Sequence, residues 1–168
     1  MHFPAVNIPV AYPFGRSAAS RFQSRPVFSV HEPAGASTQP GNSGSILLVE
    51  DDFLIASQME SALAEAGFAI AGTAGSAEEA LALAARHRPA LIVMDIRLNG
   101  NRDGIDVALE VFATYGIRCV FASAHQTAEA RMRAQPARPL AWLAKPYSMP
   151  SLVEAVRGAF RDLRAADA

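Results

Sequence analysis

The sequence predicts an α/β protein built on a five-stranded parallel sheet with helices on both faces. From Ile46 onward, short apolar runs alternate with segments of helical periodicity, and this unit occurs five times. The runs are continuously apolar, which is typical of strands that are buried on both faces of a parallel sheet. Because parallel strands require right-handed crossover connections, a (βα)5 chain of this kind favours a doubly wound sheet.

Five apolar runs predict the strands. Each run is short and bounded by turn-forming or charged residues, which favours a buried strand over a helix. In chain order the predicted strands cover residues 46–49, 68–73, 91–94, 117–122 and 140–144.

The segments between these runs predict the helices. They cover residues 53–66, 77–87, 105–115, 127–134 and 152–163. Gly67 and Gly116 are suited to end two of them, and Ser76 and Ser148 are suited to cap the starts of two others, with Pro150 in a first turn. The fourth segment has few large apolar residues, so we expect a loosely held helix there.

Residues 1–45 are predicted to form a disordered extension and linker, and residues 46–168 the folded domain. Six of the 11 prolines lie in the first part, too many for a helix or an inner strand. The run from Gln39 to Ser45 is rich in glycine and serine and predicts a flexible linker. Proline also interrupts the superficial similarity of this segment to a signal or transit peptide.

Composition excludes several functional classes. With 15 basic and 16 acidic residues the net charge is −1, which argues against a nucleic-acid-binding surface. No apolar run reaches the roughly 18 residues of a membrane-spanning helix. Cys119 is the single cysteine, so an internal disulfide and a cysteine zinc site are excluded. We therefore expect a cytoplasmic protein that binds neither nucleic acid nor membrane.

Charged and polar residues follow four of the predicted strands. In an open α/β sheet, ligands bind outside the carboxyl ends of the strands, where the strand order reverses. In the flavodoxin-like order 2-1-3-4-5, the first and third strands are neighbours at that point. The strand ends carry three carboxylates, a hydroxyl and an ammonium, which belong to Glu50, Asp51, Asp95, Ser123 and Lys145. These groups are expected to converge on one edge of the sheet.

The three carboxylates predict a site for a divalent cation. Adjacent carboxylates repel one another unless a cation or a proton lies between them. Mg²⁺ is the favoured ion, because it binds few protein carboxylates and completes its shell with water and phosphate oxygens. Asp52, which follows Asp51, is favoured as the N-cap of the next helix.

Lys145 is the only lysine, against 14 arginines (15 basic residues minus 1). Its ammonium is a compact charge that can reach a phosphoryl oxygen without the planar fork of an arginine. We interpret it as a phosphate-binding group. The next residue is Pro146, so the bond between them is a candidate for the cis form, which occurs almost only before proline.

Four segments, taken in order, resemble the receiver domain of two-component response regulators. They are Ile46–Asp52, Leu91–Asp95, Val120–Ala124 and Leu143–Tyr147. Any one segment would be a weak signal, but the ordered set is specific, and the similarity covers roughly residues 46–165. Phe121–His125 is similar to a variant of a signature found in stand-alone bacterial receivers.

The resemblance implies a flavodoxin-like (CheY-like) fold and a phosphorylation site. Asp95 would be the phosphoacceptor. Glu50 and Asp51 would hold Mg²⁺ directly or through water, and the backbone carbonyl of Arg97 would join the metal shell.

The resemblance also implies a conformational switch. Ser123, where threonine is commoner, would be the switch hydroxyl, and Lys145 would contact the phosphoryl group. Trp142 lies where receivers usually carry an aromatic residue whose rotamer follows the switch hydroxyl. A static ring that shields the sheet edge is the alternative for Trp142.

The implied function is that of a single-domain response regulator. Asp95 would accept a phosphoryl group from a histidine kinase or histidine phosphotransfer protein. The face of the fourth helix, fifth strand and fifth helix would then switch, for binding of a downstream effector protein or for a phosphorelay. Such a protein is not an enzyme, although it assists its own phosphorylation and dephosphorylation.

Two alternatives remain open. A receiver-like adaptor would bind its partner without phosphorylation. A phosphatase of the haloacid dehalogenase type would use Asp95 as its nucleophile, but it expects a second acid where Arg97 stands. A P-loop hydrolase is excluded, because its motif needs a Gly-Lys pair and the sole lysine follows Ala144.

Overall fold

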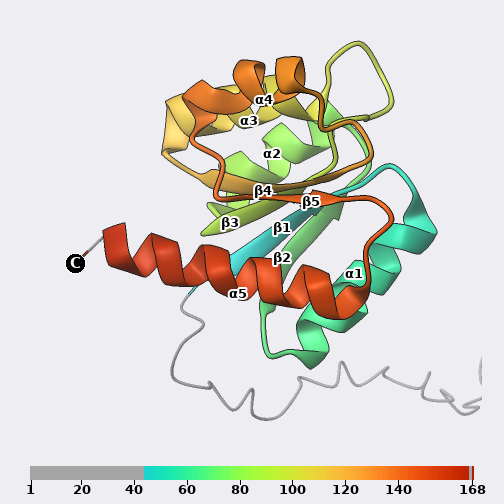
Figure 1. Ribbon diagram of the computed structural model, residues 1–168, viewed down its shortest axis with the longest axis vertical. Coiled ribbons are helices and arrows are strands. Elements are labelled where there is room, and N and C mark those ends of the chain that lie inside the picture. The colour runs from blue at the N-terminus through green and yellow to red at the C-terminus, as the bar shows by residue number, and fades with distance from the viewer. Residues whose placement is uncertain (1–43, 167) are drawn as a thin grey trace, which may run out of the picture. The chain divides into compact units, whose positions relative to one another are not determined.

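The computed structural model describes residues 44–166 and 168, which form a parallel sheet with helices on both faces (Figure 1). The strands, in chain order, are β1 (Ser45–Val49), β2 (Ala69–Ala74), β3 (Leu91–Met94), β4 (Arg118–Ser123) and β5 (Ala141–Ala144). The 5-stranded sheet has the order β2-β1-β3-β4-β5, and every pairing is parallel. The predicted fold class and strand order are confirmed. The extension and linker were predicted over residues 1–45; residues 1–43 lie outside the described residues, and Ser45 belongs to β1 instead of the linker.

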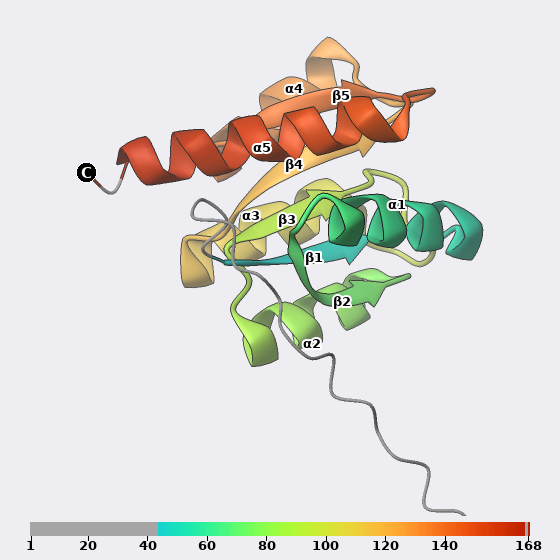
Figure 2. The ribbon, with the colours of Figure 1, turned by 90° about the horizontal axis from the view of Figure 1, so that it is seen from below.

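The helices form the two outer layers (Figures 1 and 2). One face of the sheet carries α1 (Phe53–Glu65) and α5 (Met149–Ala166), and the other carries α2 (Ala77–His87), α3 (Gly104–Tyr115) and α4 (Ala128–Ala134). Apolar side chains fill the space on each face of the sheet. The described helices include none with both the length and the apolar character that crossing a membrane requires.

The central strands are buried on both faces, which explains their continuous apolar sequence. All four residues of β3 are buried, and Ile46–Val49 of β1 are fully inaccessible to solvent. Burial of an aliphatic side chain contributes about 1.5–3 kcal/mol to the free energy of folding. These two strands therefore fix the middle of the sheet, from which Glu50 and Asp95 extend.

Helix ends follow the predicted caps. The Asp52 carboxylate accepts from two backbone N–H groups of α1 at 2.9 and 3.2 Å, and the Ser76 hydroxyl accepts from one of α2 at 3.3 Å. At the start of α5, the Ser148 hydroxyl accepts from the Ser151 N–H at 3.2 Å. Gly116 ends α3 in the left-handed conformation, with φ of 71°.

Several boundaries differ from the prediction. β1 begins at Ser45, one residue earlier than predicted, because its carbonyl accepts from the Ala90 N–H at 2.9 Å. Helix α5 extends beyond the predicted 152–163 at both ends, since its apolar positions mark only the part that packs on the sheet. Helix α4 ends at Ala134 and continues as a 3-10 turn, η1 (Gln135–Ala137), that contains Pro136.

Gly104 lets α3 start directly against the end of β3. Its N–H donates to the carbonyl of Ile96 at 2.8 Å. A Cβ atom at this position would overlap with the carbonyl oxygen of Asp95 and lie 2.9 Å from the Met94 side chain. The absence of a side chain therefore sets the distance between α3 and the strand end that carries Asp95.

Gly104→Ala should lower the free energy of unfolding by about 1–3 kcal/mol, because the added methyl group forces α3 away from β3. Gly158→Ala is the matched control. Its Cβ would meet only a side-chain nitrogen of Arg161 at 3.6 Å, and alanine is the better residue inside a helix. Urea unfolding followed by circular dichroism measures both. Equal stability of Gly104→Ala and the wild type would contradict the close approach.

Candidate functional site

Backbone hydrogen bonds continue past the ends of the strands and position the site. The Glu50 N–H donates to the Ala74 carbonyl at 3.0 Å, and the Asp95 N–H donates to the Val49 carbonyl at 2.9 Å. Between the ends of β4 and β5, the Lys145 N–H donates to the Ser123 carbonyl at 3.2 Å. The side chains of these residues therefore leave the sheet from fixed backbone at one edge, as the topology predicts.

Lys145 joins two of the acids in one ionic cluster. Its Nζ lies 2.6 Å from Oε2 of Glu50 and 2.6 Å from Oδ2 of Asp95. The two acidic residues are buried, with exposed fractions of 3% for Glu50 and 7% for Asp95. Short charge-assisted hydrogen bonds of this kind compensate for the loss of water around the carboxylates. The cluster links the ends of β1, β3 and β5.

The local environment shifts the pKa of two members of this cluster. Burial raises the pKa of Glu50 above its ordinary value, although the hydrogen bond from Lys145 works in the opposite direction. For Lys145, burial disfavours the ammonium, but the hydrogen bonds to Asp95 and Glu50 together with their negative charges outweigh it and raise the pKa. Lys145 is therefore positively charged at neutral pH.

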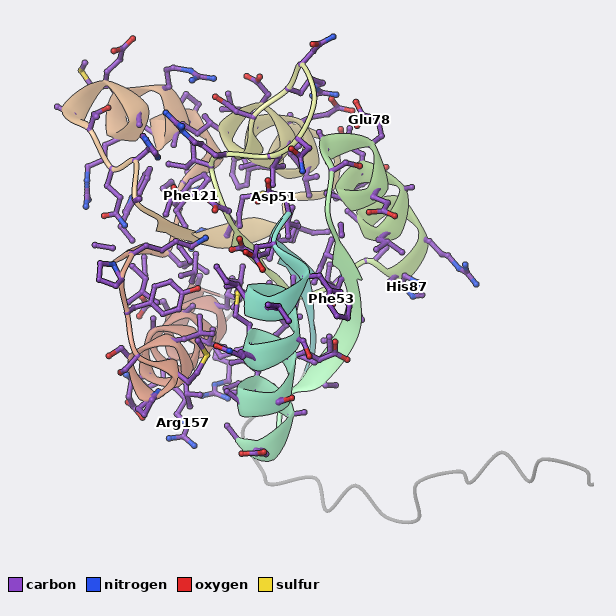
Figure 3. All side chains as sticks on the ribbon, turned by 90° about the vertical axis from the view of Figure 1, so that its right-hand side faces the viewer. Asp51, Phe53, Glu78, His87, Phe121 and Arg157 are labelled. Carbon is purple, nitrogen blue, oxygen red and sulfur yellow. The ribbon has the colours of Figure 1, made fainter. Side chains whose placement is uncertain are left out.

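Three carboxylates form an acidic cluster at this edge. Ligand atoms of Glu50, Asp51 and Asp95 all lie within 4.8 Å of one another. Asp51 is exposed, whereas the other two are buried. Figure 3 shows Asp51 in the loop that connects the end of β1 to the start of α1. Carboxylate oxygens with open access to water on one side are the donor set that a hard divalent cation prefers. The residues present therefore fit such an ion.

Ser123 lies at the end of β4, and its side chain contacts the loop that connects β4 to α4. It is 1% exposed, and its Oγ accepts from the His125 N–H at 3.2 Å. The Gln126 side chain also donates to the Ser123 carbonyl, at 3.1 Å. The hydroxyl is thus at the predicted edge, engaged with the backbone that leads into α4.

Trp142 packs in the apolar layer between the sheet and α4. Its ring stacks on Phe121 with 4.5 Å between centroids. The Arg131 guanidinium lies 4.8 Å from the centre of the Trp142 ring, within the range of a cation–π interaction. The ring is therefore in contact with α4, and its role in switching stays a prediction.

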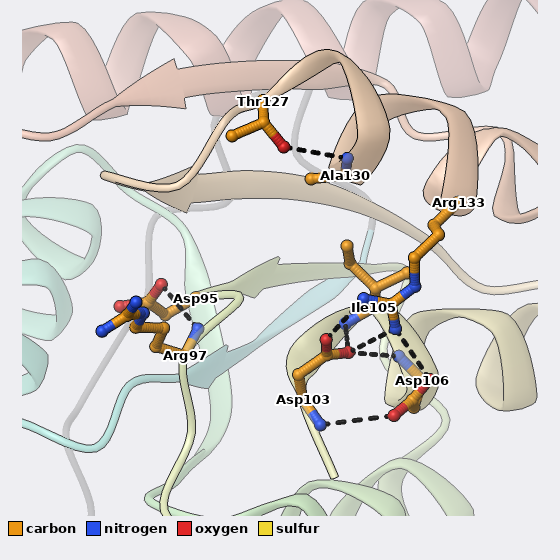
Figure 4. Close-up of polar contacts among 8 residues, drawn as sticks. All are labelled: Asp95, Arg97, Asp103, Ile105, Asp106, Thr127, Ala130 and Arg133. Atoms are coloured by element: carbon orange, nitrogen blue, oxygen red, sulfur yellow. Dashed lines mark hydrogen bonds and ion pairs between the residues drawn. The ribbon is translucent and has the colours of Figure 1, made fainter.

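Arg97 contributes its backbone to the site. Its N–H donates to Oδ1 of Asp95 at 3.2 Å, while its side chain is exposed (Figure 4). The use of its carbonyl as a metal ligand stays a prediction. The Lys145–Pro146 peptide bond is cis, in agreement with the sequence-based expectation.

Sequence reasoning did not anticipate two features near the site. One is the contact of Gly104 with Asp95, and the other is an ionic cluster of Arg133 with Asp103 and Asp106. For the two acids a signal was present in the sequence: Asp103 followed three residues later by Asp106 is similar to a capping box at a helix start. Arg133 carries no signal of its own, because its partners lie in a distant part of the sequence.

Comparison with known proteins identifies the family. A family model described as "Response regulator receiver domain" matches residues 46–157. Transcriptional regulatory protein PdtaR of Mycobacterium tuberculosis is 36% identical over 123 residues, which cover 71% of this chain and 60% of the relative. Phyllosphere-induced regulator PhyR of Methylorubrum extorquens is 29% identical over 126 residues, or 74% of this chain and 46% of the relative. The chain therefore spans about 60% or less of these relatives.

Solved structures agree with this comparison. The signal receiver domain of a modulated diguanylate cyclase from Desulfovibrio desulfuricans has a TM-score of 0.67 and 28% identity, covering 73% of this chain and 98% of that one. The receiver domain of the Erythrobacter litoralis PhyR response regulator has a TM-score of 0.63 and 26% identity, covering 71% of this chain and 92% of that one. Together with the matched family model, these similarities show that the chain belongs to the response regulator receiver domain family.

Proposed function

We propose that this receiver domain accepts a phosphoryl group on Asp95 in a Mg²⁺-dependent reaction. The donor would be the phosphohistidine of a histidine kinase or of a histidine phosphotransfer protein. The observation that carries the proposal is a buried carboxylate, Asp95, with a charged ammonium 2.6 Å away and two further acids within 4.8 Å. In this proposal, Asp95 would be the nucleophile, Lys145 would neutralise phosphoryl oxygens, and the three acids would hold the cation.

The chemistry follows from these groups. A carboxylate oxygen of Asp95 attacks phosphorus, the bond to the histidine nitrogen breaks with its electron pair left on the imidazole, and an acyl phosphate forms. The transition state spreads negative charge over the equatorial oxygens, so positioning and charge neutralisation dominate catalysis. Lys145 supplies one positive charge. Mg²⁺, held by Glu50, Asp51 and Asp95, would supply further neutralisation when bound.

The proposed switch uses Ser123. A phosphoryl group on Asp95 offers new acceptor oxygens to the Ser123 hydroxyl and to Lys145. The Ser123 hydroxyl accepts a hydrogen bond from the His125 N–H, so a turn of this side chain towards the phosphoryl group would alter that contact and with it the loop before α4. The face of α4, β5 and α5 would then differ between the two states, and that difference would be recognised by an effector protein or used in a phosphorelay.

We further propose that the chain is a regulator and not an enzyme acting on a separate substrate. It would assist only its own phosphorylation and dephosphorylation. The related PdtaR is named a transcriptional regulatory protein, which supports a regulatory role here. A location in the cytoplasm, with the phosphodonor, is part of the same proposal.

Asp95→Asn should abolish phosphorylation, because the substitution removes the nucleophilic carboxylate. Asp52→Asn is the matched control, since asparagine keeps the N-cap of α1 and the residue takes no part in the ionic cluster. The measurement is labelling by phosphoramidate with Mg²⁺, followed by mass spectrometry.

Undiminished labelling of Asp95→Asn would overturn the site assignment. A wild-type protein that takes no label would favour an adaptor that acts without phosphorylation. Repeated rapid release of phosphate by the wild type would favour the phosphatase alternative.

Ser123→Ala should be labelled at Asp95 but fail to switch, because no hydroxyl remains to follow the phosphoryl group. Trp142 is the only tryptophan, so its fluorescence reports the switch without interference. We expect beryllium fluoride with Mg²⁺ to change this fluorescence in the wild type and to change it much less in Ser123→Ala. Ser61→Ala, an exposed position on α1, serves as control. A wild-type response in Ser123→Ala would contradict the coupling.

Lys145→Arg should slow labelling on the order of tenfold without abolishing it, because the positive charge remains but the planar head cannot reproduce both short contacts. Binding of Mg²⁺ should be little changed, since no carboxylate is lost. Labelling rates and Mg²⁺ titrations measure the two effects separately. A labelling rate equal to that of the wild type would show that the geometry of the ammonium is unimportant.

A further inference from the structure

Helix α4 buries little apolar surface and makes several polar contacts. Of its residues, Ala134 is the buried one, and its largest apolar side chain, Met132, is 68% exposed. A helix with so little buried apolar surface gains little from the hydrophobic effect. The contacts of Arg131 and Arg133 therefore add to the small apolar contact that Ala130 and Ala134 make with the core.

Arg133 makes a three-point contact with the start of α3 (Figure 4). Its Nη1 lies 2.8 Å from Oδ2 of Asp103, and its Nη2 lies 3.2 Å from Oδ1 of the same carboxylate. Nη2 also donates to Oδ1 of Asp106 at 3.0 Å. Two parallel hydrogen bonds between a guanidinium and a carboxylate fix orientation as well as distance. We call these three residues the α3–α4 cluster.

The two acids of this cluster belong to a rigid part of the fold. Oδ1 of Asp103 also accepts from the N–H groups of Ile105 and Asp106, each at 3.0 Å, and Oδ2 of Asp106 accepts from the Asp103 N–H at 3.4 Å. This capping box ties both carboxylates to the first turn of α3. Gly104, in that same turn, packs on the backbone of Asp95. The anchor for α4 is thus fixed relative to the phosphoacceptor.

Helix α4 is also connected to Ser123, through Arg131 in the middle of the helix. Nη2 of Arg131 donates to Oε1 of Gln126 at 2.9 Å, and the Gln126 amide nitrogen donates to the Ser123 carbonyl at 3.1 Å. Helix α4 is therefore linked to β4 through Arg131 and to α3 through Arg133. Movement of Ser123 towards Asp95 would act, through Gln126 and Arg131, on a helix that Arg133 ties to α3.

We infer that the α3–α4 cluster is a latch that holds α4 in its resting position and opposes the switch. The inference rests on the proposed phosphorylation of Asp95. The resting state is indicated by Ser123, whose hydroxyl is engaged by His125, and by Lys145, which is paired with both buried acids. Because the paired hydrogen bonds of Arg133 tolerate little displacement, α4 cannot follow Ser123 without weakening them.

Removing the latch should shift the equilibrium towards the active state. In Arg133→Gln, we expect the affinity of the full chain for beryllium fluoride, measured with Mg²⁺ present, to rise roughly fivefold. The loss of a well-formed exposed ion-pair network changes an equilibrium by about this factor. Amide chemical shifts of residues 123–145 should move, without beryllium fluoride, part of the way towards the bound pattern.

Two further variants sharpen this test. Asp103→Asn keeps the N-cap of α3 but loses the charge, so it should reproduce the effect of Arg133→Gln, and the double variant should add little more. Arg102→Gln is the matched control, because it removes a 2.6 Å pair with Glu110 that stays within the α3 region and does not reach α4. It should leave affinity and chemical shifts unchanged.

The outcomes separate the latch from the proposed function. If the wild type binds beryllium fluoride and both Arg133→Gln and Asp103→Asn match its affinity and chemical shifts, the latch is wrong and phosphorylation at Asp95 stands. Weaker binding by the two variants would also overturn the latch, because the cluster would then stabilise the active state. A wild type that neither binds beryllium fluoride nor takes a phosphoryl label would overturn the proposed function, and the latch with it.

Discussion

Lys145 and the two buried acids that it contacts determine how the carboxyl edge of this sheet is arranged. Glu50 and Asp95 are 3% and 7% exposed, so water compensates little of their charge, and each would repel the other without a cation nearby. An ammonium 2.6 Å from both acids meets this need. Removing one member of a buried pair costs about 3–5 kcal/mol in general, because the partner charge is left uncompensated. Lys145 therefore stabilises the fold at this edge, and under the proposed function the same side chain would also take part in phosphoryl transfer.

The position of Lys145 in the sheet gives this interaction a second consequence. β5 is an edge strand that pairs with β4, and it is less buried than β1 and β3. Lys145 ties its carboxyl end to Glu50 and Asp95. Under the proposed function, a phosphoryl group on Asp95 changes the partners of Lys145, and that change is transmitted to the strand that carries Trp142.

The fold and the convergence of the site residues could be predicted because both follow from local patterns. Continuous apolar runs identify the strands, and the carboxyl ends of parallel strands must share one edge. The hydrogen bond of Ser123 with His125 depends on loop geometry that no pattern specifies. The Arg133 cluster joins side chains 30 residues apart in sequence, and an arginine in a polar helix is usually only solvated. Tertiary contacts between exposed charged residues therefore lay beyond sequence reasoning.

The weak apolar anchoring of α4 is consistent with a role as the moving element. Each buried aliphatic side chain would add about 1.5–3 kcal/mol to the cost of displacing the helix. A ligand shifts an equilibrium only by the difference in its interaction energy with the two states, and an almost complete shift requires about 5.5 kcal/mol. Helix α4 buries Ala134 and makes an exposed ionic contact through Arg133. Under the proposed function, the energy difference between the two states would then be small enough for a single phosphoryl group to supply. Under the proposed function, polar anchoring would give α4 a defined resting position at a displacement cost that phosphorylation of Asp95 can overcome.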